Sequence, residues 1–220
     1  AMCCLQNEEG TFNFTPWLWS TGATSYDINN DNGIKALTLV KDLVDAGSMS
    51  KEVINWTQGD VMNQFISGNI AMMVNGPWQV PTMREQAPDL NWDVTLLPKD
   101  AEYASCLGGE NFGVIDGDNV DAALDFLQFA TSKDEVASYI DDFGYIAARK
   151  DVAEGQFTDD ETMQKFTEEM QYAQPRGPHA QWPEISDALS LVVNESITGT
   201  STPADAAAKA QSTIDGILAE

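Results

Sequence analysis

The 220-residue sequence lacks the motifs by which many hydrolases and nucleotide-using enzymes are recognised. It has no GxSxG elbow, no glycine-rich phosphate loop and no HExxH pair. A histidine-based triad would have to use His179, the only histidine in the chain. Paired carboxylates could serve a glycosidase, but among 35 acidic residues such pairs arise by chance. We therefore expect a protein that is not an enzyme.

Cysteine is also scarce. Cys3 and Cys4 are adjacent and Cys106 lies far along the chain, without the paired spacing of a zinc site. With one histidine there is no metal-binding constellation either, so we expect neither a metal nor another cofactor. A disulfide between Cys106 and the N-terminal pair is compatible with the sequence, which does not establish it.

Positive charge is the third shortage. Eleven Lys and Arg face 35 Asp and Glu, which gives a formal charge of −24. Such a surface repels phosphate backbones and anionic lipid headgroups, so we expect no nucleic acid partner and no binding to a bare membrane. No apolar run approaches the roughly 20 residues that span a bilayer, and we expect no signal peptide at the start of the chain.

Apolar periodicity predicts many helices separated by single strands, an order that favours an α/β fold over an all-α one. Helices are expected over residues 31–47, 59–67, 120–130, 132–144, 160–173, 184–197 and 203–218. Strands are expected over 70–75, 92–97 and 111–115. Residues 11–24 crowd aromatic side chains around Pro16 and are interpreted as a dense loop.

Tryptophan is plentiful, and several of the six indole rings lie beside proline or glycine in the turn-like segments PWLW, GPW and QWP. A ring at the mouth of a cleft suits a pyranose, because the C–H face of the sugar stacks on the ring while its hydroxyls bond to carboxylates and amides. Each tryptophan could instead be a core or lid residue. That alternative is the stronger one for Trp56 and Trp92, which lie within expected regular elements.

Several segments, in the same order, resemble family 1 extracellular solute-binding proteins, the maltose-binding-protein-like group. GDVMNQFISGNIAMMVNGPW resembles the family's F-x-x-G-x-x-A-M helix end and N-G-P-W turn. WDVTLLPKD resembles its strand ending in proline, and LGGENFGVI its Gly-Gly crossover strand. ALDFLQFATSKDEVASYIDDFGYIAARKDV is similar to its helix pair and G-x-x-P-x-R loop, with Ala147 in place of the proline. PWLWSTGA resembles its W-S-x-G-G segment, with Ala23 in place of the second glycine.

The resemblance, which covers nearly the whole chain, implies a two-lobed α/β fold of the periplasmic-binding-protein-like type II class. Full-length members are far longer, so we expect this chain to be a C-terminal fragment that lacks most of the N-terminal lobe. Residues 1–107 and 156–220 would form the C-terminal lobe. Residues 108–155 would contain the hinge crossover and a segment that normally belongs to the N-terminal lobe. The strand expected at 111–115 would then lack its usual neighbours, which favours self-association.

The resemblance also implies a function, which is to capture an oligosaccharide between the lobes and deliver it to the permease of an ABC importer. Such a protein lies in the periplasm or, as a lipoprotein, on the extracellular face of the cytoplasmic membrane. Trp78 is the first candidate for stacking on the sugar. The further candidates for ligand binding are Trp17, Trp19, Glu110, Asn111, Tyr145, Arg149 and Trp182, with Gly108 and Gly109 at the hinge.

Three alternatives stay open at this point. A polyamine or another non-sugar solute would suit an acidic, tryptophan-bearing cleft through cation–π contacts. A carbohydrate-active enzyme would need a carboxylate pair at a fixed separation and would show turnover. A protein-interaction scaffold would use the aromatic segments as an interface and would not respond to sugars.

Overall fold

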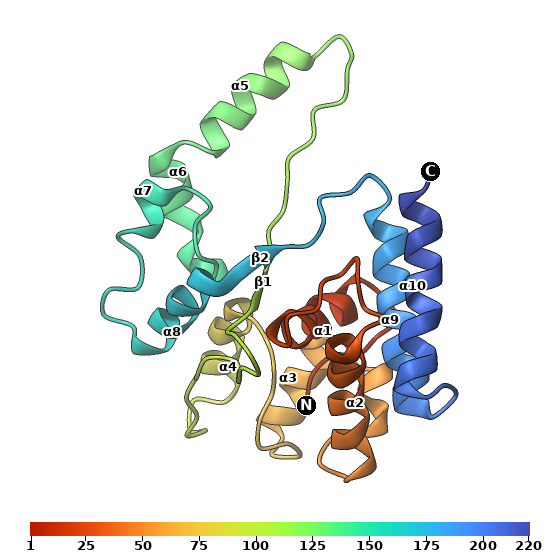
Figure 1. Cartoon of the computed structure of the whole chain (residues 1–220). Coiled ribbons are helices and arrows are strands. Elements are labelled where there is room, and N and C mark those ends of the chain that lie inside the picture. Colours follow the sequence, from red (N-terminus) through yellow and green to blue (C-terminus); the bar gives the residue numbers. More distant parts are fainter. The chain divides into compact units, whose positions relative to one another are not determined.

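The computed structural model describes all 220 residues and divides them into two compact units. Unit 1 contains Ala1–Asn75, Leu96–Leu107 and Glu169–Glu220. Unit 2 contains Gly76–Thr95 and Gly108–Glu168. Helices dominate both units (Figure 1). None of them combines the length and apolar character needed to cross a bilayer. The division of the full-length protein into lobes stays a prediction.

Unit 1 consists of helices from both ends of the chain packed around one apolar core. Its helices are α1 (Glu8–Ser20), α2 (Asp31–Asp45), α3 (Gln58–Ile66), α9 (Trp182–Thr198) and α10 (Pro203–Leu218), with 3-10 helices at Lys51–Ile54 and Met170–Tyr172. Helices α1 and α2 pack against α9, and α10 packs against α9 and α2 (Figure 1). Each of these four helices contributes a fully buried side chain, namely Phe14, Leu37, Leu189 and Ile214.

A two-stranded parallel sheet lies beside α1 in unit 1. Strand β1 (Ser105–Leu107) pairs with β2 (Ala173–Pro175), and Ser105 lies opposite Ala173. Several helices of this unit begin at a polar side chain that accepts a hydrogen bond from a backbone N–H of the first turn, which satisfies a donor that has no partner within the helix. The capping residues are Asn7, Asn30, Thr57 and Thr202.

Unit 2 has shorter helices and a smaller core. Its helices are α4 (Val80–Gln86), α5 (Val120–Ala130), α6 (Lys133–Tyr139), α7 (Lys150–Ala153) and α8 (Glu161–Glu169, the last residue in unit 1), with 3-10 helices at Pro77–Gln79 and Asp141–Phe143. A small buried cluster forms from Val136, Ala147 and Val152. Helix α5 buries none of its residues, although Leu124, Phe126 and Phe129 are apolar.

Most of the predicted helices are confirmed. The five predicted over 31–47, 59–67, 120–130, 184–197 and 203–218 occur within two residues of the expected ends. The two predicted over 132–144 and 160–173 are shorter, because each gives way to a 3-10 helix.

The interpretation of residues 11–24 as a loop is wrong, because residues up to Ser20 belong to α1. Proline inside a helix removes one N–H and leaves the carbonyl four residues earlier without its usual donor. Here the hydroxyl of Thr15 donates to that carbonyl, on Phe12, at 3.4 Å. Burial of Phe14 and Leu18 stabilises the helix on both sides of Pro16.

The strands predicted over 70–75, 92–97 and 111–115 are also wrong, since none of these segments forms a strand. A strand requires a hydrogen-bonded neighbour along its length. For residues 72–74 the hydrogen-bonded neighbour is the single residue Ala1. Its N-terminal amino group donates to Met72 O at 2.6 Å, and its carbonyl accepts from Val74 N at 2.8 Å. Apolar character alone does not supply that neighbour, and the sequence pattern reports only the apolar character.

Asp160 ties α4 to the start of α8 in unit 2. Both Nη atoms of Arg84 donate to its carboxylate, at 2.7 and 2.8 Å, and Met163 N–H donates at 3.2 Å. The hydrogen bonds that Arg84 donates to Asp160 are the main reason why the pKa of Asp160 lies below its usual range. Because this pKa is lower in the folded state, the stabilisation is present above the ordinary aspartate pKa of about 4 and is lost as the pH falls through the folded-state pKa.

We predict that Asp160→Asn lowers the free energy of unfolding by about 1 kcal/mol at pH 7, since the ion pair is partly exposed. Urea unfolding followed by circular dichroism at pH 7 and at acidic pH measures the effect, which should shrink as the pH falls. Asp159→Asn is the control, because Asp159 is its exposed neighbour. An equal loss in both variants would contradict the prediction.

All three cysteines are free and buried. Burial raises the pKa of Cys3 and of Cys106 to about 11 and raises the pKa of Cys4 as well. Because the thiolate is the reactive form, we predict that all three thiols of the folded chain react slowly with Ellman's reagent at pH 8. After unfolding in guanidinium chloride, three thiols per chain should react rapidly. Fast reaction of even one thiol before unfolding would show that it is exposed or has an ordinary pKa.

Candidate functional site

Glu8, in the first turn of α1, gathers hydrogen-bond donors from a distant part of unit 1. Its Oε1 accepts from Trp182 Nε1 at 3.0 Å and from Arg176 Nη1. Its Oε2 accepts from Ser186 Oγ. Arg176 directly follows β2, and Trp182 and Ser186 lie in the first turns of α9. We call Glu8, Phe12, Arg176, Trp182 and Ser186 the Glu8 cluster.

On the buried side of the Glu8 cluster lie two hydroxyl groups, those of Thr11 and Ser186. Thr11 Oγ1 donates to the carbonyl of Ser186 at 2.9 Å, and the two hydroxyl oxygens are also 2.9 Å apart. Both residues are buried, whereas the carboxylate of Glu8 is nearly half exposed. The carboxylate is therefore held from the inside of unit 1 and open to solvent on its outer side.

An aromatic ring lies beneath the cation of the cluster. The guanidinium of Arg176 sits 4.8 Å from the centroid of the Phe12 ring, within the range of a cation–π contact. Four-fifths of the Arg176 side chain is buried. Together with the bond to Glu8, this contact fixes the plane of the guanidinium rather than leaving it free in solvent.

The turn between β2 and α9, just before Trp182, contains a glycine with a positive φ. Gly177 has φ +81°, which few other residues adopt. A Cβ there would lie 3.0 Å from His179 N and 3.7 Å from the indole of Trp182. His179, the only histidine, accepts a hydrogen bond from Gln181 N at 3.1 Å through Nδ1 within the same turn.

The nearby thiol of Cys106 is not a nucleophile at neutral pH. Burial raises its pKa to about 11, while its contact with Thr15 and the charge of Arg176 oppose the rise. No group of three His, Cys, Asp or Glu side chains in the chain could hold a metal ion. The cluster offers aromatic surface, guanidinium donors and a carboxylate side by side. This combination suits recognition of a polyhydroxylated ring.

Unit 2 carries an aromatic group of its own, formed by Trp78, Phe143 and Tyr145. The Trp78 and Tyr145 ring centroids are 6.3 Å apart at 48°, and Phe143 is 6.3 Å from Tyr145. Two glycines permit this arrangement. A Cβ on Gly76 would lie 2.1 Å from the Trp78 ring, and one on Gly144 (φ +66°) would lie 2.7 Å from Pro77 O.

The other predicted ligand-binding residues lie outside these two groups. Trp19 is 6% exposed and donates its indole N–H to Ser25 Oγ at 3.1 Å. Trp17 is partly buried against the same core, and its indole N–H makes no hydrogen bond within the chain. Trp17 and Trp19 therefore both lie at packing positions of the unit 1 core. Arg149 is bonded to Asp151 and to the Thr131 carbonyl at the end of α5.

The residues from Gly108 to Asn111 directly follow β1 and are all exposed. Gly109 has φ +149°, a conformation that glycine adopts readily. Glu110 and Asn111 therefore reach solvent, and neither belongs to the Glu8 cluster.

The structure thus brings together two of the predicted residues, Trp78 and Tyr145, and places Trp182 in the Glu8 cluster. Sequence reasoning missed the other four members, Glu8, Phe12, Arg176 and Ser186. One signal could have found Arg176, which is one of only 11 basic residues and stands in the same Pro-Gly-Pro turn as Trp182. Nothing in the sequence pattern pairs residue 8 with residues 168 to 178 positions away.

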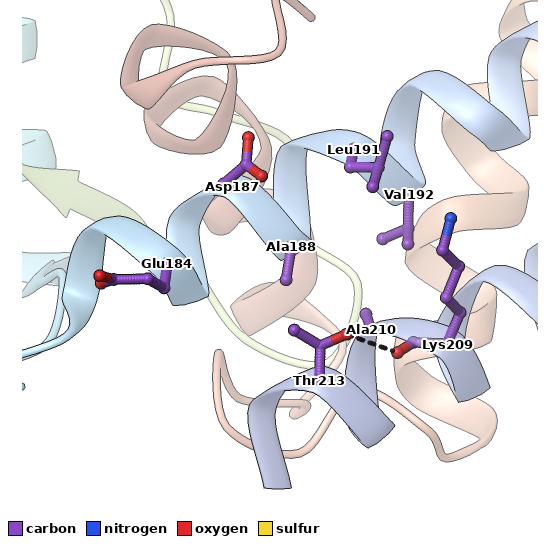
Figure 2. Close-up of a pocket in the computed structure, with 8 residues that line it drawn as sticks. All are labelled: Glu184, Asp187, Ala188, Leu191, Val192, Lys209, Ala210 and Thr213. Carbon is purple, nitrogen blue, oxygen red and sulfur yellow. Dashed lines mark hydrogen bonds between the residues drawn. The ribbon is translucent and has the colours of Figure 1, made fainter. Parts of the chain in front are cut away.

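A small cavity lies between α9 and α10 (Figure 2). Its volume is about 80 Å³, well below the roughly 300–1,000 Å³ of a typical ligand pocket. The lining residues are Glu184, Asp187, Ala188, Leu191, Val192, Lys209, Ala210 and Thr213. The Thr213 hydroxyl donates to the Lys209 carbonyl at 3.3 Å within α10. This cavity is too small to hold a sugar.

Comparison with known proteins shows the family. Residues 5–165 match the model of the bacterial extracellular solute-binding proteins. Candidate binding proteins of Brucella abortus and Brucella suis are 26% identical to the chain over 207 residues, which is 88% of this chain and 50% of each relative. The chain therefore spans about half the length of the curated relatives it matches.

Solved structures of solute-binding proteins share the fold. An ABC transporter solute-binding protein from Thermotoga lettingae, bound with α-D-tagatose, is 25% identical with a TM-score of 0.84, over 99% of this chain and 59% of that one. Maltose-bound MalE3 of T. maritima is 21% identical with a TM-score of 0.82, over 99% and 60% of the two chains. The latter likeness shows the fold alone.

These matches confirm the predicted α/β fold of the periplasmic-binding-protein-like type II class, represented here by part of the whole. The family and these structural neighbours are binding proteins and not enzymes. The chain belongs to the family of bacterial extracellular solute-binding proteins.

Proposed function

We propose that the chain is part of the solute-capturing component of an ABC importer and that its solute is a carbohydrate. The observation that carries this proposal is the Glu8 cluster, in which a partly exposed indole, a guanidinium and a carboxylate lie together. The Thermotoga lettingae relative is bound with tagatose and the T. maritima one with maltose, which supports a sugar ligand. The full-length protein would deliver the sugar to a permease, either from the periplasm or as a lipoprotein on the extracellular face of the cytoplasmic membrane.

The Glu8 cluster has the groups that a sugar needs. The indole of Trp182 would stack on the C–H face of the ring and contribute about 1 kcal/mol. Donors on Arg176 would bond hydroxyl oxygens, each charge-assisted bond contributing about 1.5–3 kcal/mol. Trp78, beside Tyr145 in unit 2, is the second proposed stacking surface. Gly108 and Gly109 remain the proposed hinge residues.

A polyamine is the alternative that the acidic composition favours. Arg176 argues against it at the Glu8 cluster, because its guanidinium would repel a cation there and already occupies the carboxylate of Glu8. A neutral sugar meets no such repulsion.

Binding measurements on the full-length gene product test the proposal. Thermal shift and calorimetry against tagatose, maltose, a cyclic malto-oligosaccharide and spermidine should show a rise in Tm with a sugar. We predict that Trp182→Ala and Trp78→Ala each weaken binding at least about tenfold, through loss of stacking and of its alignment. The 220-residue chain alone should bind more weakly than the full-length product.

Trp92→Ala is the matched control, since Trp92 is a partly exposed tryptophan of unit 2 outside both aromatic groups. Unchanged affinity in both Trp182→Ala and Trp78→Ala would contradict the proposed site. A response to spermidine and to no sugar would favour the polyamine alternative.

We also propose that residues 108–155 pack against a part of the full-length protein that lies outside this chain. Exposed apolar side chains in this segment support the proposal, because large apolar patches of this kind mark interaction surfaces. Phe112, Ile115, Phe126 and Phe129 are each more than half exposed, and Ile115 reaches 91%. The relatives have the additional length that such a partner requires.

In the absence of that partner, the exposed apolar surface should cause the 220-residue chain to self-associate. We predict a mass above that of one chain in light scattering after size exclusion, rising with concentration. Changing Phe126 and Phe129 together to Ser should lower that mass towards 24.0 kDa. Leu39→Ser, at an exposed apolar position of α2, is the control and should leave the mass unchanged.

A further inference from the structure

We infer that Glu8 is a positioning residue, whose carboxylate fixes the orientation in which Trp182 and Arg176 meet the solute without binding the solute itself. The inference rests on the proposed function and assigns separate tasks to Glu8, on the one hand, and to Trp182 and Arg176, on the other.

The first argument is the occupancy of the carboxylate. An ionised carboxylate offers about four acceptor sites on its two oxygens. Three of them are taken by donors of this chain, two at Oε1 and one at Oε2. Little acceptor capacity is left for a sugar hydroxyl. The bonds that Glu8 makes therefore point to a structural partner of the binding groups.

The second argument is what the bonds to Glu8 leave free. The indole of Trp182 is bonded through the N–H at its edge, so this bond uses neither face of the ring. Arg176 has five N–H donors, and its bond to Glu8 uses one of them. The carboxylate thus holds both side chains by their edges and leaves their recognition groups for the solute.

The third argument is that the carboxylate of Glu8 is anchored from the inside of unit 1. The Arg176 side chain is only 20% exposed, and the Glu8 side chain is 46% exposed. Its inner oxygen is nevertheless anchored on Ser186, which is buried beside Thr11. A carboxylate that is anchored on a buried residue and bonded to both Trp182 and Arg176 fixes the geometry of those two side chains.

The matched control lies one residue away. Glu9 shares the first turn of α1 and the same charge, but its Oε2 accepts from Gln58 N at 2.8 Å, at the start of α3. Glu9→Ala therefore removes the same favourable charge at the helix start as Glu8→Ala does, without touching Trp182 or Arg176.

The experiment uses the full-length gene product and two measurements. The first is the ¹H–¹⁵N spectrum of the indole N–H groups, in which Trp182→Phe identifies the Trp182 signal. Glu8→Ala should move the Trp182 signal without added sugar, and Glu9→Ala should not. The second is the affinity for whichever of tagatose, maltose and the cyclic malto-oligosaccharide raises the Tm. Glu8→Ala should weaken it about tenfold, and Glu8→Gln, which keeps an acceptor at this position, should restore part of the loss.

The double variant of Glu8→Ala with Trp182→Ala distinguishes positioning from direct contact. If Glu8 acts through Trp182, the double variant should lose less affinity than the product of the two single effects. Independent, multiplying effects would show that Glu8 does not act through Trp182 and would overturn the inference. Unchanged affinity in Glu8→Ala, with Trp182→Ala still impaired, would overturn the inference and leave the proposed function intact. If no sugar binds the unchanged protein, the proposed function fails and the inference fails with it.

Discussion

Helix α1 comes from the first 20 residues and α9 from residues 182–198, and the two pack against each other in unit 1. Their contact is close because Thr11 and Ser186 are small and their buried hydroxyls bond to each other's side chain or backbone. Phe14 and Leu189 complete the packing as fully buried side chains. The Glu8 cluster exists only because this contact brings the first turn of α1 beside the first turns of α9. Whatever separates these helices also takes the carboxylate away from the indole and the guanidinium.

Unit 2 follows a different physical rule, since its local geometry depends on backbone approach more than on a large core. Its buried cluster has only three members, and α5 buries nothing. Glycine at positions 76 and 144 lets two loops come close enough for Trp78 and Tyr145 to meet. The Arg84–Asp160 pair joins α4 to α8 where apolar contact is sparse. Order in this unit is thus specified by a few particular residues, whereas in unit 1 it is distributed over many buried ones.

Local chemistry made the helices predictable. Thr57 and Asp60 form a capping box at the start of α3, and Pro203 lies in the first turn of α10. Helix α5 begins and ends at the residues predicted from its apolar period. The failures involve information that periodicity does not contain. Pro16 suggested a break in α1, but the Thr15 hydroxyl donates a hydrogen bond to the carbonyl of Phe12, which has no N–H donor at Pro16. The segment 70–75 has the composition of a strand without a neighbour along its length. In the candidate site, Trp182 could be named from its turn, but Glu8 and Arg176 become partners only through the tertiary fold.

The order in which the chain visits its two units has a consequence for synthesis. The chain passes between the units at four points, and the core of unit 1 draws on segments from both ends of the sequence. While a ribosome is still making α9 and α10, the apolar faces of α1 and α2 lack the two helices that cover them in the folded unit. Contacts between residues so far apart in sequence form slowly, because closing the long loop between them costs entropy before the contacts can stabilise the fold. Unit 1 therefore completes its core only after α9 and α10 have been made, which leaves time for a chaperone to engage the unfolded nascent chain.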